Sequence, residues 1–400
     1  MKKWVIAAVV IVIVLAIAGL FFINHESDYE STDYSEGQLN DEGKNLIFGE
    51  NGQDEENSGD KRLESNGNEN CPLVFTEYLV DPKYLQKVGQ IGVVHGSGKY
   101  IVERSYISIK QEFWEQKIPL YAPTDMVLRS GSRYNINNDK YLDDYALDFD
   151  AGCGIQVSLG HVKEVVPVVA EKLPEAKGDS RTQSLGDIKF EAGELIGYYV
   201  QQRGEGAVAG FDFITRDAGF ENTFTNQERY QDRSSQNLLH GVCPYDFYTG
   251  EKKEAYYNLL GSAGGKLFEV KDCGSASRDV PGSISGMWFL EKEIKGYPFE
   301  EEGYKDGDYG STLPISADEE AVTIGNLGPS KTSRVYSDNP SYKLPEEVTE
   351  EHCYQFLQGL ENQGYVYFKV VDEMSMDVYY SSSGACPAEF PSSGAKRYWK

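Results

Sequence analysis

The segment Leu142–Asp150 contains four aspartates, whose carboxylates could act in acid–base catalysis. From Tyr145 onward polar and apolar residues alternate, so Tyr145, Leu147 and Phe149 face one side of a strand and the later aspartates face the other. Paired carboxylates can act as the acid and base of a hydrolase when their environments differ, but the sequence shows no such asymmetry. We therefore favour a half-buried strand with a solvated acidic face over a paired-carboxylate hydrolase.

The sequence gives little support to other common kinds of metal or catalytic site. Asp306 and Asp308 could begin a calcium loop, but the later bidentate glutamate is missing at the required spacing, and Asp-Gly is common in turns. The sequence has no G-x-S-x-G nucleophile elbow and no C-x-x-C pair. His352 directly precedes Cys353, but neighbours on a strand point to opposite faces, so this adjacency indicates no dyad.

The elements that would position functional side chains are mainly strands. Short runs of β-branched and aromatic residues bounded by glycine or proline predict strands at Tyr106–Ile109, Ile155–Leu159, Leu195–Val200, Phe211–Ile214 and across Tyr365–Tyr380. Apolar spacings of three and four predict helices at Glu251–Leu260, Glu350–Leu360 and Val165–Leu173, the last with Pro167 in its first turn. Asp279–Leu290 is typical of a loop entering a strand with a buried tryptophan.

The N-terminus predicts a membrane anchor. Lys2 and Lys3 precede the uncharged apolar run Trp4–Ile23, long enough to cross a hydrocarbon core of roughly 30 Å. Acidic residues follow this run, so the positive-inside rule places the rest of the chain outside the cytoplasm. A cleaved signal peptide is the alternative, with Ala16–Ala18 as its cleavage site. Both interpretations export the body of the protein.

Six cysteines agree with an exported chain, in which an even number indicates disulfides. Sequence separation favours pairing Cys243 with Cys273 and Cys353 with Cys386, which leaves Cys71 and Cys153. The net charge of −26 argues against a nucleic-acid partner. Such acidity favours solubility or a cationic partner.

Composition divides the chain into four parts. Residues 1–23 form the anchor or an uncleaved signal, and residues 24–70 form a polar, acidic stalk that buries too little apolar surface to fold. A β-domain is expected over residues 71–235. A second β-rich subdomain with short helices is expected over residues 236–400.

Within the first β-domain, residues 91–217 contain three sequence motifs. Ile118–Asp125 is similar to a "pV-A-P-x-D/G" strand and turn, Leu159–Val162 to a "Y-G-H-L" strand, and Phe190–Gly197 to a "v-k-x-G-d-x-I-G" turn. In this order and spacing they resemble the lysostaphin-type zinc endopeptidases. The resemblance implies a mostly β fold of the duplicated hybrid motif (barrel-sandwich hybrid) type.

The same resemblance implies a lost zinc site. The family holds zinc with a His and an Asp from a first motif and with the second His of an H-x-H strand. Between Gly96 and Thr124 this chain has neither His nor Asp, and its counterpart of the H-x-H strand places Gly210 and Asp212 where the histidines belong. A catalytic zinc site needs three protein ligands and an open position. We therefore expect no cofactor and no catalytic residue.

Three residues remain candidates for the groove that the family uses. His161 could be a structural strand histidine or could line a retained binding groove together with Asp212. His95, in a Gly/Ser loop, could swing inward and complete a His/His/Asp set adequate for zinc. If the motifs align as proposed, His161 and Asp212 lie close together and the carboxylate raises the imidazole pKa.

The sequence therefore predicts a noncatalytic, single-pass membrane protein with an extracytoplasmic body that binds a cell-envelope polymer or a protein partner. The alternative is an active zinc endopeptidase or murein hydrolase with a rearranged metal site. A third interpretation makes the fold a structural spacer.

Overall fold

The computed structural model describes residues 73–94, 96, 98–134, 143–173, 183–202, 210–230, 236–262, 265–290, 292, 312–327, 330–358 and 361–400. The expected anchor and stalk, His95 and the Asp306–Asp308 turn lie outside these residues. Within them, no helix is both long and apolar enough to cross a membrane.

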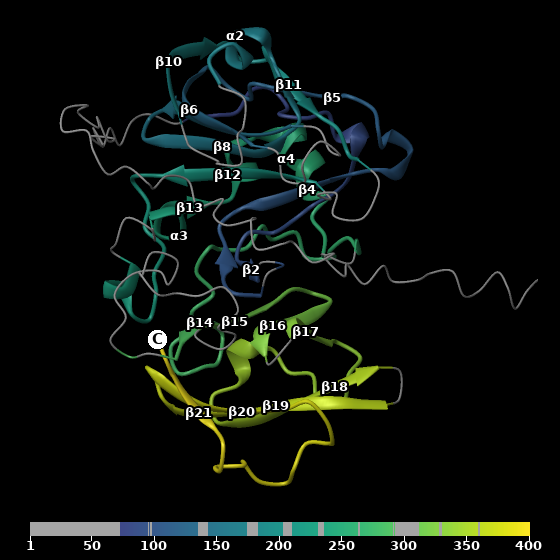
Figure 1. The fold of residues 1–400 in the computed structure, drawn as a ribbon, viewed down its shortest axis with the longest axis vertical. Coiled ribbons are helices and arrows are strands. Elements are labelled where there is room, and N and C mark those ends of the chain that lie inside the picture. The colour runs from purple at the N-terminus through teal and green to yellow at the C-terminus, as the bar shows by residue number, and fades with distance from the viewer. Residues whose placement is uncertain are drawn as a thin grey trace, which may run out of the picture. The chain divides into compact units, whose positions relative to one another are not determined.

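The described chain is mostly β (Figure 1). The first sheet is antiparallel and has the order β1-β4-β12-β8-β7-β6-β10, with β13 paired to β12. Its strands are β1 Leu85–Val88, β4 Ser105–Ile109, β6 Met126–Tyr134, β7 Asp144–Gly152, β8 Ile155–Val162, β10 Gln183–Phe190, β12 Phe211–Asp217 and β13 Gly241–Val242. Two small sheets accompany it: β5 Ile118–Tyr121, β11 Leu195–Tyr199 and β9 Glu164–Val165 form one, and β2 Val93–Val94 and β3 Ile101–Val102 form the other.

The second large sheet is also antiparallel, and in Figure 1 its strands β19, β20 and β21 run side by side. Its order is β17-β16-β15-β14-β21-β20-β19-β18, so the first of its strands along the chain pairs with the last. The strands are β14 Gly286–Phe289, β15 Thr312–Ala317, β16 Ala321–Leu327, β17 Ser330–Tyr336, β18 Glu351–Gln358, β19 Glu361–Asp372, β20 Ser375–Ser381 and β21 Lys396–Trp399. Trp288 of β14 is fully buried, which confirms the expected strand with a buried tryptophan.

Helices are short. The α-helices are α2 Pro167–Ala170, α3 Gln236–His240 and α4 Gly250–Tyr257, and the 3₁₀ helices are η1 Pro82–Tyr84, η2 Gln111–Phe113, η4 Gln227–Tyr230, η6 Pro244–Phe247 and η7 Pro345–Glu347. Helix α4 confirms the helix predicted from residue 251, and α2 begins at Pro167, where a missing N–H costs no hydrogen bond.

The helix predicted at Glu350–Leu360 is wrong, because strand β18 occupies this segment. Tyr354 and Phe356 are both buried, with Gln355 between them facing the other side. The same apolar residues thus satisfy a period of two as well as a helical spacing. Pairing with the long strand β19 decides between the two periods.

Two disulfides match the expected pairs, Cys243–Cys273 and Cys353–Cys386. Cys153 is also disulfide-bonded, and no cysteine in the described part of the chain is free. Cys71 lies outside the described residues. The oxidised cysteines agree with the disulfide framework that an exported chain would carry.

Two buried apolar clusters underlie the sheets. The first extends from Phe75 to Phe289, and the second extends from Ile284 to Tyr398. Residues of the 236–283 segment, such as Tyr245 and Tyr256, contribute to the first cluster. Along the chain, residues of the first cluster therefore give way to residues of the second between Ile284 and Phe289.

Candidate functional site

The candidate site lies on the first sheet where β8 is flanked by β12 and β7, and the pairing of β8 with β12 is visible in Figure 1. Asp212 of β12 stands opposite Gly160 of β8. The β7–β8 register shifts between Tyr145 and Leu147, so Gly160 and His161 oppose the single residue Ala146. His161 sits in this bulge with a φ of 62°, in the left-handed region. A bulge of this kind redirects a side chain.

Gly160 allows the Asp212 carboxylate to lie across the neighbouring strand. A Cβ added at Gly160 would approach Asp212 Oδ2 to 2.7 Å, closer than any real Cβ contact. The Gly-His pair recognised in the sequence therefore has two separate roles. Glycine makes room for the carboxylate, and histidine occupies the bulge beside it.

Six charged side chains form a connected group here, which we call the ion-pair network: Glu103, Arg104, Asp144, His161, Lys163 and Asp212. Asp144 Oδ2 lies 3.0 Å from His161 Nδ1 and accepts a hydrogen bond of 2.8 Å from Lys163 Nζ. Asp212 Oδ2 accepts a hydrogen bond of 3.0 Å from Arg104 Nη1. The imidazole joins the two halves, because His161 Nε2 lies 3.9 Å from Asp212 Oδ2.

The network is almost closed to solvent. The side chains of Asp144 and Asp212 are 1% and 3% exposed, and that of His161 is 13% exposed. Isolated charges at such depth are strongly unfavourable, so each must have partners. Two acceptor atoms, Asp144 Oδ1 and Asp212 Oδ1, are buried and receive no hydrogen bond from any described group.

The pKa values of the network follow from competing effects. Burial is the largest single effect on His161 and lowers its pKa, but the charge and hydrogen bond of Asp144, together with the charge of Asp212, outweigh it and leave the pKa raised. Burial likewise raises the pKa of Asp144, but His161 and Lys163 outweigh it and leave the pKa lowered. The arrangement therefore favours an imidazolium held by a carboxylate.

The expected proximity of His161 and Asp212 is confirmed by their 3.9 Å separation. Their role in binding stays a prediction. Asp144, rather than Asp212, is the nearer carboxylate, and the sequence analysis had not singled it out. Asp144 lies before the alternating residues of the strand, and its side chain is fully buried.

Comparison of the chain with models of protein families finds no match. Comparisons with curated proteins and with solved structures find none either. The lysostaphin-type resemblance therefore rests on the three sequence motifs alone.

The arrangement of side chains around Asp212 is poorly suited to binding a metal ion. Among the described residues, no group of three or more His, Cys, Asp and Glu side chains is arranged to hold a metal. The carboxylate of Asp212 is bound by the guanidinium of Arg104, which would repel a dication at the same oxygen. His95, the third member of the rearranged set, lies outside the described residues.

Beyond the network, the same face of the sheet stays polar; we call it the polar face. Cross-strand pairs place Asp212 opposite Gly160, Ile214 opposite Ser158 and Arg216 opposite Gln156, so these residues share one side. The opposite side is apolar, with Phe149, Val157, Leu159 and Phe213 in the first buried cluster.

The polar face becomes more exposed along the strands. Asp148 accepts hydrogen bonds from Ser158 and Ser130, and burial raises its pKa. Further along, exposed Arg129 donates to both Asp150 and Asp187. Alternation in the sequence could reveal Asp148 and Asp150, but Arg129, which binds Asp150, lies on the neighbouring strand β6 and carries no local signal in the sequence.

Proposed function

We propose that this chain is a noncatalytic, membrane-anchored, extracytoplasmic protein whose lysostaphin-like module binds a cell-envelope polymer or a protein partner. One observation carries the noncatalytic part. At the position where the related peptidases hold zinc with a histidine, Asp212 forms a buried ion pair with Arg104. A catalytic zinc ion needs three protein ligands that are free to bind it and one open coordination position. Here the carboxylate of Asp212 is already paired with the guanidinium of Arg104.

The surroundings of His161 are also poorly suited to acid–base catalysis without a metal. The Nδ1 atom of His161 is committed to Asp144, and burial leaves Nε2 facing Asp212. A general base must reach the proton that it abstracts in a bound substrate. An imidazole enclosed between two carboxylates is better suited to holding strands together than to accepting a substrate proton.

The binding part of the proposal rests on the polar face. Arg129, Asp150, Gln156 and Asp187 present donors and acceptors at its more exposed end, over a rigid antiparallel sheet. Planar guanidinium and carboxylate groups on rigid strands suit hydrogen bonding to a hydroxylated or amide-rich polymer. The expected anchor and stalk would place this face outside the cell membrane.

A sedimentation assay tests this proposal. The full-length protein in detergent is mixed with purified peptidoglycan sacculi, and the bound fraction is compared for the parent, Arg129→Ala and Gln156→Ala. Lys369→Ala is the matched control, because the partly exposed Lys369 pairs with Glu351 in the second sheet. We expect the first two variants to lose binding and the control to keep it.

Retention by sacculi that is indifferent to the polar-face variants would contradict the assignment of this face. No retention would leave a protein partner as the ligand, which chemical cross-linking on intact cells would detect. Absence of both signals would favour the structural spacer. Release of cross-link peptides by the parent protein would instead establish the peptidase.

A further inference from the structure

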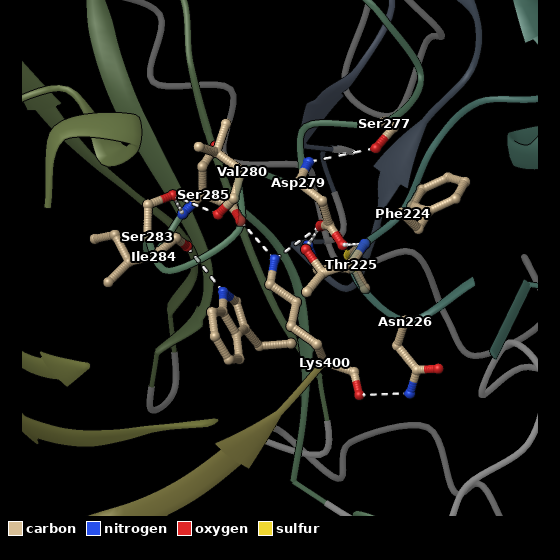
Figure 2. Close-up of polar contacts among 12 residues, drawn as sticks. Phe224, Thr225, Asn226, Ser277, Asp279, Val280, Ser283, Ile284, Ser285 and Lys400 are labelled. Atoms are coloured by element: carbon tan, nitrogen blue, oxygen red, sulfur yellow. Dashed lines mark hydrogen bonds and ion pairs between the residues drawn. The ribbon is translucent and has the colours of Figure 1, made fainter. Parts of the chain in front are cut away.

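A lysine and an aspartate meet at the point where the second sheet begins and ends along the chain. Asp279 precedes strand β14, and Lys400 follows strand β21. The two strands are neighbours, with Phe289 paired to Trp399. Figure 2 shows the Lys400 side chain reaching toward Asp279 between these segments.

The ammonium group of Lys400 and the carboxylate of Asp279 are in contact and are shielded from water. Lys400 Nζ lies 2.7 Å from Asp279 Oδ1, and the two side chains are 1% and 2% exposed. The ammonium nitrogen also lies 4.4 Å from the centre of the Trp288 ring. Gly286 completes the enclosure, because any Cβ there would collide with both groups.

The surroundings of Lys400 and Asp279 favour condensation of the amine with the carboxyl group. Burial lowers the pKa of Lys400, although Asp279 opposes the change, and so makes the nucleophilic neutral amine more accessible. The backbone N–H of Met287 donates to Asp279 Oδ1 and that of Thr225 donates to Oδ2, at 3.2 and 3.1 Å. Backbone donors aimed at a carboxyl group stabilise the negative charge that develops on its oxygen during nucleophilic attack.

We propose that Lys400 and Asp279 form an intramolecular isopeptide bond. One proton first moves from Lys400 Nζ to the Asp279 carboxylate, giving a neutral amine and a neutral acid. The nitrogen lone pair attacks Cγ, and a C–N bond forms. One C–O bond then breaks, and the hydroxyl leaves with a second proton from the nitrogen as water. The product is a secondary amide, and the step needs no oxidant, reductant or co-reactant.

The position of this bond gives it a mechanical consequence. Because Asp279 stands before the first strand of the second sheet and Lys400 after the last, the amide closes the sheet into a covalent ring. Pulling on the chain, or cutting it once within the ring, would then not separate the strands. Such a lock suits an extracytoplasmic body and is independent of what the first sheet binds.

Peptide mass spectrometry of the native full-length protein tests the proposal. After denaturation, reduction, alkylation and proteolysis, we expect a branched peptide that joins Asp279 to Lys400, one water lighter than its two linear parts. Synthetic linear peptides calibrate the amounts, and the branched form should account for most of the Asp279. Lys400→Arg keeps the positive charge but removes the amine, so it should yield only linear peptides.

Linear peptides carrying Asp279 and Lys400 in full amount from the parent protein would overturn the proposal and leave an ordinary buried ion pair. A branched peptide that persists in Lys400→Arg would also overturn it, since another lysine would then be the nucleophile. The first result does not depend on the folding of any variant, because the parent protein alone decides it.

Discussion

Asp144 offers the sharpest test of the ion-pair network, through the isosteric substitution Asp144→Asn. Its carboxylate lies 3.0 Å from His161 Nδ1 and 2.8 Å from Lys163 Nζ. With an effective dielectric constant of about 20, each attraction is worth about 5–6 kcal/mol before desolvation is subtracted. Breaking a buried pair from one side leaves the other charge unpaired, and we expect a loss of about 3–5 kcal/mol of unfolding free energy.

The measurement is denaturant unfolding of the detergent-solubilised protein, followed by tryptophan fluorescence. Asp187→Asn is the matched control, because it removes one exposed partner of Arg129 on the same sheet. Exposed pairs contribute at most about 1 kcal/mol, so the control should unfold almost like the parent. A loss of less than about 1 kcal/mol in Asp144→Asn would refute the reasoning, because Lys163 and His161 would then not depend on this carboxylate.

The same variant should change the pH dependence of stability. The pKa of His161 is raised in the folded state, so its contribution is complete below the unfolded value of about 6.5 and is lost as pH rises through the folded value. The pKa of Asp144 is lowered, so its contribution is present above about 3.9 and is lost as pH falls through the folded value. NMR titration of His161 should show its pKa falling in Asp144→Asn, and an unchanged pKa would contradict the contact.

Four further predictions follow from other parts of the chain. Gly160→Ala should destabilise the protein and weaken the Asp212–Arg104 pair, because the new Cβ would meet Asp212 Oδ2 at 2.7 Å; unchanged unfolding would mean that the carboxylate lies elsewhere. Replacing both Cys243 and Cys273 with alanine should cost about 3–4 kcal/mol for a closed loop of 30 residues, measured by unfolding under oxidising conditions. Few or no cysteines should react with a maleimide in the denatured, unreduced protein, and mostly free thiols would indicate a reducing compartment. The chain should fractionate with membranes through Trp4–Ile23, and an N-terminus beginning at Gly19 in the native protein would show a cleaved signal instead.

The sequence predicts the strands of the site well because burial on one face imposes a clear period of two. Phe211–Ile214 and Ile155–Leu159 carry that period and form β12 and β8. The alignment of the three motifs predicts that His161 and Asp212 lie close together, and their 3.9 Å separation agrees with it.

The partners of these residues could not be predicted in the same way. Arg104 and Asp212 are separated by 108 positions, and only the pairing of β12 with β4 brings them together. Asp144 could not be assigned to a face from the sequence, because it lies before the alternating residues and alternation alone cannot show that both faces of β7 are covered. The strand at residues 351–358 was missed for a related reason, since its short apolar pattern fits two periods.

We propose that a buried ion-pair network, rather than a metal, occupies the position that corresponds to the zinc site of the peptidases whose motifs the sequence resembles. The most direct measurement is the metal content of the native full-length protein, purified without chelators and titrated with Zn²⁺ by calorimetry. We expect substoichiometric zinc, no saturable Zn²⁺ binding, and no change in either on Asp212→Asn or His161→Gln. One tightly bound zinc per chain that disappears in either variant would contradict it and establish a metal centre at this site.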